Sequence, residues 1–165
     1  MQQIRLRPMT PAEFEAIRNR MVQEYAAEHV AAGNWSAEDA ERRATEDTRA
    51  LLPQGVETPG MLMLVAETSG AEVVGRVWLA LERQPGSGGG AWIYDIEVAL
   101  EHRGQGFGRA LLAAAEDEAA RRGVDSIGLN VFGTNTVAQS LYRSAGYDVA
   151  AMQLHKKLGP GVGPS

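Results

Sequence analysis

A glycine-rich stretch between a predicted strand and a predicted helix constrains this chain more than any other feature. The stretch reads Arg103-Gly104-Gln105-Gly106-Phe107-Gly108 and lies between a strand-like run, 91–98, and a strongly helical pattern, 106–122. Three glycines at alternate positions let the backbone turn tightly and point successive N–H groups outward. At a helix N-terminus such donors form an anion site, and Arg103 adds a forked cation. The sequence therefore predicts a loop suited to a pyrophosphate.

Two nucleotide-binding motifs that also contain clustered glycines do not fit this stretch. A nucleotide P-loop requires a lysine and a hydroxyl residue after its last glycine, and neither is present here. The dinucleotide fingerprint requires a third glycine at position 109, which is Arg109. A tight strand-to-helix turn that binds nothing is compatible with these glycines, because short glycine patterns are weak signals. The surrounding sequence has to decide between the turn and the anion site.

The hydrophobic pattern predicts a mixed α/β chain. Strands are expected at 4–7, 61–66, 73–81, 91–98 and 126–131, followed by one or two closing strands between Tyr147 and Leu158. Helices are expected after Thr10, after Ser36 as far as Leu52, and at 106–122 and 135–145. Hairpin-linked strands should pair antiparallel, whereas the strand–helix–strand unit 91–131 should be a parallel crossover.

Length and local signals refine this plan. The 165 residues suit one domain, which we place at 1–158, and the Gly- and Pro-rich tail 159–165 is expected to be disordered. Thr10 and Glu13 form a capping box at the start of the first helix. The residues 85–90 suggest a loose hairpin loop.

Composition excludes several classes of protein. A net charge of −5 argues against a nucleic-acid partner, since such domains carry a basic surface. The chain has no cysteine, so it forms no thiolate metal site and no enzyme thioester. Its three histidines stand singly, without metal-ligand spacing, and we predict no metal. No apolar run approaches a membrane span, and the N-terminus lacks the apolar core of a signal peptide, so we expect a cytoplasmic protein.

Two motifs together resemble one family. Arg103 to Gly108 matches the Gln/Arg-x-x-Gly-x-Gly/Ala signature of the GNAT superfamily of acyl-CoA N-acyltransferases. The downstream stretch 129–147, with Asn135, the pair Leu141-Tyr142 and the terminal Gly146-Tyr147, is similar to the second signature of that family. The resemblance implies an α/β fold (α+β mixed sheet). Its mostly antiparallel central sheet splays between the fourth and fifth strands, and about four helices flank it.

The resemblance also implies which residues bind acetyl-CoA. In the family the cofactor lies in the gap between the splayed strands, where the main chain of Ile96 and Val98 would pair with the pantetheine arm. The Val98 N–H would donate to the thioester oxygen and to the oxyanion that forms on attack. The pyrophosphate would be held by the loop residues Arg103, Gly104, Gln105, Gly106, Phe107, Gly108 and Arg109.

On the second helix of the motif, Asn135, Ala138 and Tyr142 share one face by their spacing. The resemblance directs this face to the cofactor groove, where Asn135 would bond the pantetheine amide and Ala138 would let the arm approach. Tyr142 would be the general acid for the departing thiolate. Val137, Leu141 and Ala145 form a second, apolar face that we expect to face the core.

Asp95 and Glu97 share one face of their strand, opposite Tyr94, Ile96 and Val98. Two unpaired carboxylates would be costly to bury, so we expect them to line the acceptor cleft. We predict that Glu97 is the general base and that Asp95 anchors a substrate ammonium. Some relatives carry an acid on the fifth strand instead, a position that here is Asn130.

These observations predict transfer of an acyl group, most simply acetyl, from acetyl-CoA to a primary amine by direct attack in a ternary complex. The expected partners are acetyl-CoA and an amine acceptor, with no nucleic acid and no membrane, and the chain would act as a monomer or homodimer. Two alternatives stay open: a non-catalytic acyl-CoA-binding sensor, and an interaction module that uses the fold only as a scaffold. The acceptor itself carries no signature in the sequence.

Overall fold

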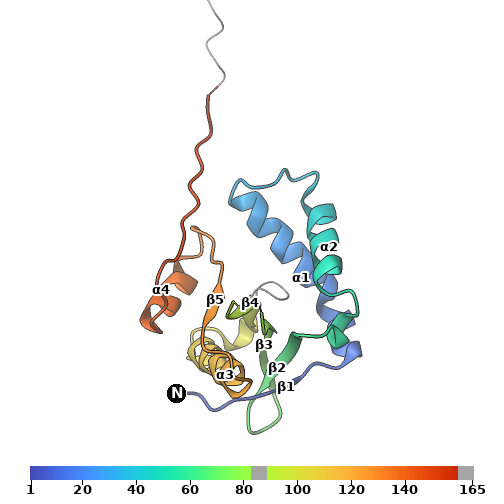
Figure 1. The fold of residues 1–165 in the computed structure, drawn as a ribbon, viewed down its shortest axis with the longest axis vertical. Coiled ribbons are helices and arrows are strands. Elements are labelled where there is room, and N and C mark those ends of the chain that lie inside the picture. Colours follow the sequence, from blue (N-terminus) through green and yellow to red (C-terminus); the bar gives the residue numbers. More distant parts are fainter. Residues whose placement is uncertain (83–88, 160–165) are drawn as a thin grey trace, which may run out of the picture.

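The computed structural model of the chain describes residues 1–82 and 89–159. These residues contain five β-strands and four α-helices (Figure 1). In chain order they are β1 (Arg5–Pro8), α1 (Pro11–Ala31), α2 (Ala40–Leu51), β2 (Met61–Glu67), β3 (Val73–Ala80), β4 (Ala91–Val98), α3 (Phe107–Arg121), β5 (Ile127–Leu129) and α4 (Thr136–Ser144). The four predicted helices and the first five predicted strands are therefore confirmed, with differences at their ends.

The strands form one mixed sheet in the order β1-β2-β3-β4-β5. The first four strands pair antiparallel, and β5 pairs with β4 in parallel. The parallel pair arises because the chain crosses over through α3 between β4 and β5, as predicted. β4 is thus an interior strand, and β5 is the last strand of the sheet within the described residues. This confirms the predicted fold class.

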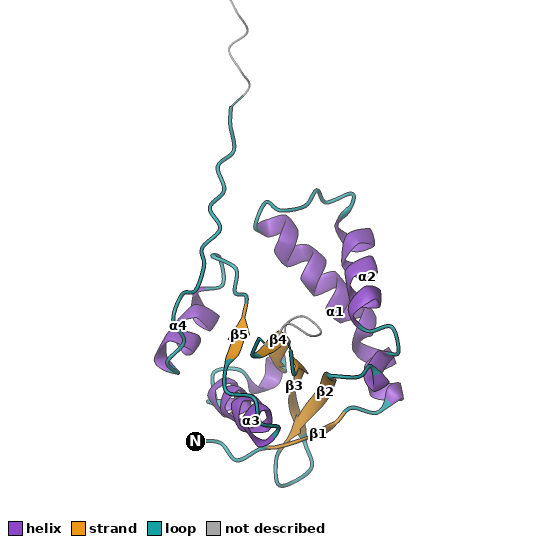
Figure 2. Cartoon of the chain, viewed as in Figure 1, coloured by secondary structure: helices purple, strands orange, loops and turns teal. Residues whose placement is uncertain are grey.

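Helices cover both faces of the sheet (Figure 2). α3 packs on one face, and the fully buried side chains there include Val74, Val77, Leu79, Leu111 and Leu112. α1 and α2 cover the other face, with a second core cluster that includes Phe14, Met21, Leu52, Met63 and Trp78. Gly75 permits close packing of β3 against β4 and α3, because an added Cβ would lie 2.5 Å from the Glu97 carbonyl oxygen and 3.2 Å from Leu111 Cδ2. The ends of β3 and β4 are thereby held tightly against α3.

The start of α1 follows directly from its sequence. The Thr10 side chain accepts the Glu13 N–H at 3.2 Å, and the Glu13 carboxylate accepts the Thr10 N–H at 2.8 Å. Pro11 occupies the first helical position, where its missing N–H costs no hydrogen bond. The predicted capping box is confirmed, and it fixes the N-terminal end of the helix that later lies over β4.

β4 contains a β-bulge that shifts the predicted alternation of side chains. Its pairing with β3 steps from Trp78–Asp95 to Leu79–Ile93, so Tyr94 is the extra residue. The Tyr94 ring packs on the α1 side of the sheet, 4.8 Å from the ring of Trp78. The prediction that Tyr94 faces away from Asp95 is wrong, because the inserted residue interrupts the alternation and places both side chains on the same face of the sheet.

The C-terminal segment, residues 147–159, also differs from the prediction. We expected closing strands between Tyr147 and Leu158, but this segment contains no strand. It leaves the end of α4 and runs away from the sheet in extended form (Figure 1). A strand forms only where a neighbour satisfies its N–H and C=O groups, and no strand of the described chain lies beside this segment. Most of the predicted loop 85–90 and of the predicted tail 159–165 lies outside the described residues.

Candidate active site

The loop after β4 has the backbone conformation expected of an anion site. Gly104 and Gly106 adopt positive φ angles of 72° and 87°, which residues with a Cβ rarely adopt. Gly106 is the N-cap of α3, and no side chain caps this helix end. The space beside Gly104 is open, because an added Cβ would meet nothing within 4 Å. The first N–H groups of α3, with the positive end of the helix dipole, are therefore available to an anion.

The Arg103 side chain turns back toward β4. Its Nε donates to the Val98 carbonyl oxygen at 3.0 Å, and its Nη2 lies 3.3 Å from Glu97 Oε1. About half of the side chain is exposed (53%). Arg103 thus secures the end of the strand on which the loop is mounted, and its predicted contact with a pyrophosphate stays a prediction.

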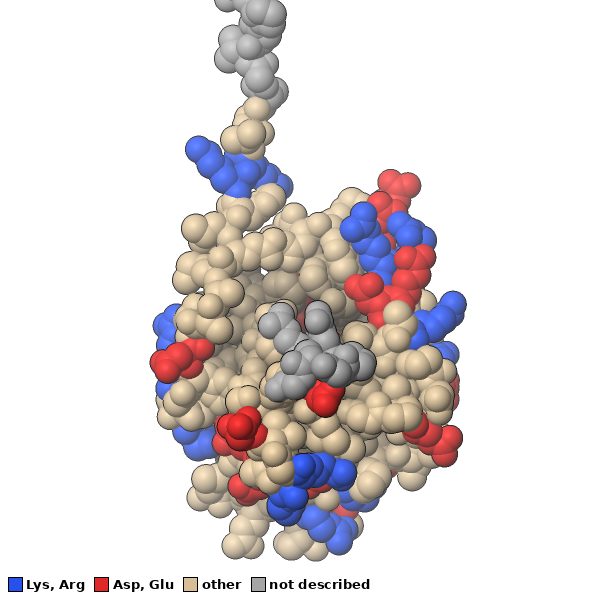
Figure 3. Space-filling view, in the orientation of Figure 1, with Lys and Arg blue, Asp and Glu red and all other residues tan. Residues whose placement is uncertain are grey.

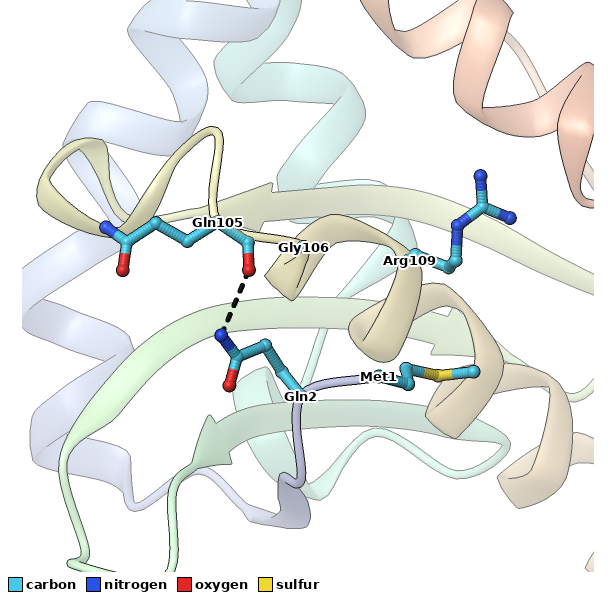
Figure 4. A pocket seen from close by; sticks show the side chains of 5 residues that line it. All are labelled: Met1, Gln2, Gln105, Gly106 and Arg109. Atoms are coloured by element: carbon cyan, nitrogen blue, oxygen red, sulfur yellow. Dashed lines mark hydrogen bonds between the residues drawn. The ribbon is translucent and has the colours of Figure 1, made fainter.

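A cavity of about 390 Å³ lies directly beside the glycine loop. Figure 4 shows its lining residues: Met1, Gln2, Gln105, Gly106 and Arg109. The Gln2 side chain donates to the Gln105 carbonyl oxygen at 3.0 Å, so the N-terminus forms one wall of the cavity. Opposite it, Arg109 donates to Ser144 Oγ at 2.7 Å and ties α3 to α4. The loop therefore borders a concave surface that is lined by loop residues, the first two residues of the chain and one guanidinium group.

The edge of β4 that faces β5 is only partly paired. The parallel ladder joins Ala91–Ile93 to Ile127–Leu129 and ends there. On the other edge, the Ala99 N–H donates to the Val74 carbonyl at 2.9 Å. Because successive residues of a strand alternate in direction, Ile96 and Val98 turn their N–H and C=O groups toward the β5 side, beyond the end of the ladder. The predicted splay between the fourth and fifth strands is confirmed.

The inward face of α4 consists of Ala138, Leu141 and Tyr142. All three are partly buried, and Leu141 and Tyr142 pack against the core on the α3 side. Leu141 also lies close to Gly108, where an added Cβ would be 3.3 Å from its Cδ2. The glycine loop, the end of β4 and α4 therefore meet at one place.

The predicted core face of α4 is only partly right. Leu141 is inside, but Val137 is 83% exposed and Ala145 is also exposed. A nine-residue helix can bury only a narrow strip, and the Tyr142 ring buries more apolar surface there than Val137 would. The face that carries Tyr142 is thus the buried one.

Asn135 is the N-cap of α4. Its side-chain oxygen accepts the Ala138 N–H at 3.1 Å, which satisfies one of the free donors at the helix start. The side-chain nitrogen of Asn135 takes no part in this bond. The predicted hydrogen bond from Asn135 to pantetheine stays a prediction.

Tyr142 lies in an environment that keeps its hydroxyl protonated. Burial raises the pKa of Tyr142, and the negative charges of Asp95 and Glu28 raise it further. Its ring also contacts Tyr147, at a centroid separation of 5.7 Å. A phenol that holds its proton at neutral pH can donate that proton to a more basic group, which is what a general acid requires.

Arg76 of β3 lies between the two carboxylates of β4. Its Nε donates to Asp95 Oδ2 at 2.7 Å, and its Nη2 contacts Glu97 and lies 2.9 Å from Glu24 of α1. Arg76 is 6% exposed, so these are ion pairs within the protein. Burial raises the pKa of Asp95, and the positive charge of Arg76 opposes this shift. The prediction that both carboxylates line the acceptor cleft assumed that they have no partner within the protein. That assumption is wrong, because sequence spacing within β4 does not show the cation on β3.

Glu97 is the most heavily paired of these carboxylates. Besides Arg76, it contacts Arg20 of α1 at 3.1 Å and Arg103 at 3.3 Å. Burial raises the pKa of Glu97, and Arg76 and Arg20 lower it. The role of Glu97 as general base stays a prediction. Its three guanidinium partners count against this role, because they stabilise the charged carboxylate and so disfavour the uptake of a substrate proton.

Sequence reasoning missed Glu28, which lies one helical turn after Glu24 on α1. Glu28 is exposed, and it forms no ion pair with a described residue. Partial loss of hydration raises the pKa of Glu28, and the charges of Asp95, Glu24 and Glu97 act in the same direction. The signal that could have identified Glu28 is its spacing of four residues from Glu24, which places both carboxylates on one face of α1.

An aromatic cluster joins the end of α1 to the loop after β5. The His29 ring stacks on Trp35 at 3.9 Å and meets Phe132 edge to face at 5.0 Å. Burial lowers the pKa of His29, so the ring is neutral at neutral pH. His29 is thus a packing residue that links α1 to the loop after β5.

The described residues show no metal site and no membrane helix. Within 1–82 and 89–159, no three His, Cys, Asp or Glu side chains are grouped so that they could hold an ion. No helix in the same ranges is long and apolar enough to cross a membrane. Figure 3 shows acidic and basic side chains scattered over this face of the molecule, without a single large patch of either sign.

The splayed sheet, the uncapped α3 and the inward tyrosine of α4 agree with a match to a family model. Residues 18–147 match the Acetyltransferase (GNAT) family. The chain belongs to this family of acetyltransferases. GNAT enzymes use acetyl-CoA as co-substrate.

Relatives and solved structures support the assignment. The chain is 32% identical to the uncharacterized N-acetyltransferase YycN of Bacillus subtilis, over 94% of this chain and 99% of YycN. The crystal structure of YycN matches with a TM-score of 0.90, over 96% of this chain and 100% of that one. A mycothiol acetyltransferase of Kytococcus sedentarius is 30% identical over 96% of this chain, but this chain spans only 49% of that protein.

Proposed function

We propose that this GNAT enzyme transfers the acetyl group of acetyl-CoA to the primary amine of a small cationic acceptor, by direct attack in a ternary complex. The observation that carries the proposal is the part of the β4 edge that extends beyond the ladder with β5 and leads to the uncapped N-terminus of α3. An extended thioester-bearing arm can pair with that edge while its pyrophosphate reaches the helix terminus. The absence of cysteine supports direct transfer, since no thiol can carry the acetyl group.

The donor half of the site would use main-chain groups. Ile96 and Val98 would pair with the pantetheine arm, and the Val98 N–H would stabilise the oxyanion that forms on the thioester carbonyl. The amides of the loop, from Gly104 to Arg109, would bind the pyrophosphate. Asn135 and Ala138 would contact the arm from α4, on the same helix face as Tyr142.

Tyr142 would protonate the thiolate of CoA as it leaves. The raised pKa of Tyr142 keeps the proton on the phenol until the thiolate forms beside it. The proton then moves from the Tyr142 hydroxyl to sulfur, and the phenolate regains a proton from solvent. The charges of Asp95 and Glu28 disfavour the phenolate, so they hold the proton on Tyr142 before the thiolate forms and favour rapid reprotonation of the phenolate afterwards.

The acceptor half would be formed by carboxylates between α1 and β4. Asp95 is fixed by Arg76 and would attract the ammonium form of the acceptor. Before attack, the amine has to lose a proton, because an alkyl amine is protonated near neutral pH. Glu97 was predicted to accept this proton, and Glu28 is a second candidate because it is not engaged in an ion pair among the described residues.

An amine-panel assay of CoA release tests this function. Because the protein has no cysteine, a thiol reagent reports only the CoA that turnover produces. We expect amine-dependent release with a cationic small molecule, from a panel of aminoglycosides, polyamines, amino acids and lysine peptides. Acetyl-CoA binding in calorimetry without release for any amine would instead identify a non-catalytic sensor. Absence of acetyl-CoA binding would leave only a scaffold role.

A further inference from the structure

A network of ion pairs joins α1 and the sheet to the glycine loop. Within residues 1–82 and 89–159 it consists of three guanidinium groups and three carboxylates, which belong to Arg20, Arg76, Arg103, Glu24, Asp95 and Glu97. Glu97 is its centre, because all three guanidinium groups contact this carboxylate. The positive and negative charges of the network are equal in number, and they link the candidate acceptor site to the candidate donor site.

Arg103 is a member of this network that can leave it at little cost. Its side chain is 53% exposed, whereas that of Arg76 is 8% exposed. The contact of Arg103 with Glu97 measures 3.3 Å, and two other guanidinium groups still pair with Glu97 if Arg103 moves away. An exposed ion pair contributes little to stability, since water replaces the partner. Arg103 can therefore change its partner without loss of the fold.

The second contact of Arg103 lies on the part of β4 that the donor would use. Its Nε donates at 3.0 Å to the carbonyl oxygen of Val98, the residue whose main chain would pair with the pantetheine arm. This carbonyl lies beyond the end of the ladder with β5, so a side chain binds it where a neighbouring strand would otherwise do so. An arm that pairs with this edge needs the same oxygen. The guanidinium group and the arm therefore compete for one position.

A pyrophosphate at the loop would offer Arg103 a stronger partner. Arg103 directly precedes Gly104, where the loop amides that would bind the pyrophosphate begin. A pyrophosphate bears more than one negative charge and can accept two parallel hydrogen bonds from a guanidinium fork. Glu97, in contrast, is a single carboxylate that two other guanidinium groups already share. Electrostatics therefore favours the transfer of Arg103 from Glu97 to the donor.

We infer that Arg103 couples the two halves of the site: when acetyl-CoA binds, its guanidinium group leaves Glu97 and the Val98 carbonyl for the pyrophosphate. The Val98 carbonyl is then open to the pantetheine arm. The network of ion pairs loses one of its three positive charges, and the ammonium group of the acceptor matches the negative charge that is left. The amine is thus attracted more strongly once the donor is in place. This inference rests on the proposed binding of acetyl-CoA and goes beyond it by giving Arg103 an effect on both substrates.

A double-mutant cycle in acetyl-CoA affinity tests the coupling. If Arg103 has to leave Glu97, Glu97→Gln should tighten acetyl-CoA binding by about two- to fivefold, the range for an exposed ion pair that no longer has to be broken. In an Arg103→Gln background the same substitution should lose this gain, because no ion pair competes with the donor there. Glu101→Gln, at an exposed position between β4 and the loop, controls for the removal of a negative charge near an anionic ligand. Calorimetric titration gives each Kd, and circular dichroism verifies folding.

Proton uptake on binding gives a second readout that needs no variant of Glu97. Departure of the Arg103 charge raises the pKa of Glu97, so the unmodified protein should take up protons when acetyl-CoA binds in weak acid. The other charged groups that face Glu97 stay in place, namely Arg20 and Glu24 of α1, Arg76 of β3 and Asp95 of β4. Arg103→Gln should take up fewer protons, because Glu97 then has the same partners before and after binding. Titrations in two buffers of different ionisation enthalpy measure the uptake, and the phosphates of the ligand contribute equally to both proteins.

Three results would overturn the coupling while acetyl-CoA still binds. The first is additivity of Glu97→Gln and Arg103→Gln in the cycle. The second is a gain from Glu97→Gln that is no larger than the gain from Glu101→Gln. The third is equal proton uptake by the unmodified protein and Arg103→Gln. An unmodified protein that does not bind acetyl-CoA would overturn the proposed donor site together with the coupling.

Discussion

Arg76 Nε lies 2.7 Å from Asp95 Oδ2, across the pairing of β3 with β4. The guanidinium group is almost fully buried, and it also contacts Glu24 and Glu97. A buried charge is costly unless it is paired, so these four side chains have to be considered together. The pairing holds the Asp95 carboxylate in a fixed position at the floor of the candidate acceptor site.

The substitution Asp95→Asn should chiefly weaken acceptor binding. The substitution preserves shape but removes the charge that would attract an ammonium group, and Glu24 and Glu97 still compensate Arg76. We expect the amine KM to rise about tenfold or more, corresponding to a charge-assisted bond, with little change in kcat. Steady-state kinetics with the best amine of the panel measures this. Asp117→Asn, on the exposed side of α3, is the control; equal KM values for the two variants would exclude Asp95 from acceptor binding.

Gly106→Val should abolish acetyl-CoA binding. Gly106 has φ of 87° at the N-cap of α3, a conformation that a β-branched residue adopts only with strain, so the loop amides would be displaced. Calorimetric titration with acetyl-CoA is the measurement, and circular dichroism verifies folding. Gly70→Val, at a turn glycine without positive φ, should bind normally. Unchanged affinity of a folded Gly106→Val protein would remove the loop from the site.

Tyr142→Phe should reduce turnover without affecting the donor. The ring and its packing are retained, whereas the hydroxyl that would protonate the CoA thiolate is lost. We expect kcat to fall by about 10²–10⁴-fold with a similar acetyl-CoA Kd. Tyr147→Phe, on the neighbouring ring, is the matched control for loss of a phenol near the site. Turnover within a few fold of the unmodified enzyme would mean that water or another residue is the acid.

Stability should decline in acid through the ion pairs of Arg7. Arg7 bonds Glu13 at 2.7 Å and Glu67 at 2.6 Å, and it lowers the pKa of both carboxyls, that of Glu13 to about 2. Because these folded-state pKa values lie below the ordinary 4.5, the stabilisation is complete above about pH 4.5 and is lost as the pH falls toward about 2. Urea unfolding of the unmodified chain and Arg7→Gln should differ most near neutral pH and converge in acid. A constant difference across that range would contradict the linkage.

The sequence was sufficient for features that depend on neighbouring residues along the chain. The capping box at Thr10, the glycine loop with Gly104 and Gly106, and the parallel crossover through α3 all follow from local spacing. It was not sufficient for the bulge at Tyr94, because an inserted residue has no signature in an alternating apolar run. The partner of Asp95 was missed for a related reason: Arg76 is distant in sequence and adjacent only after β3 and β4 pair. A single charged residue within the buried run of β3 was the signal that could have identified it.

The C-terminal segment shows another limit. The prediction of closing strands there is wrong, because the segment pairs with no strand of the described chain. Pattern predicts which face of a strand prefers to be buried, and it contains no information about whether a neighbouring strand is present to pair with. The exposed fractions of Met152, Leu154 and Leu158 are the consequence.

The identity of the general base can be decided by comparing two carboxylates of different surroundings. Glu97 contacts Arg20, Arg76 and Arg103, whereas Glu28 forms no ion pair with a described residue. The pKa of each is raised from its ordinary value, so either would be protonated, and inactive as a base, at the acidic end of the pH range. The acidic limb of the pH–rate profile therefore reports the residue that accepts the proton.

If Glu28 is the base, Glu28→Gln should lower kcat and flatten the acidic limb of the profile. Glu97→Gln should then retain an acidic limb, and its main effect should be lower stability, since it leaves a buried Arg76 with one fewer partner. The opposite pattern would identify Glu97 as the base. Glu38→Gln, in the α1–α2 connection, controls for the loss of an exposed carboxylate. Should both Glu28→Gln and Glu97→Gln retain the limb, the proton leaves through water, and neither carboxylate is the base.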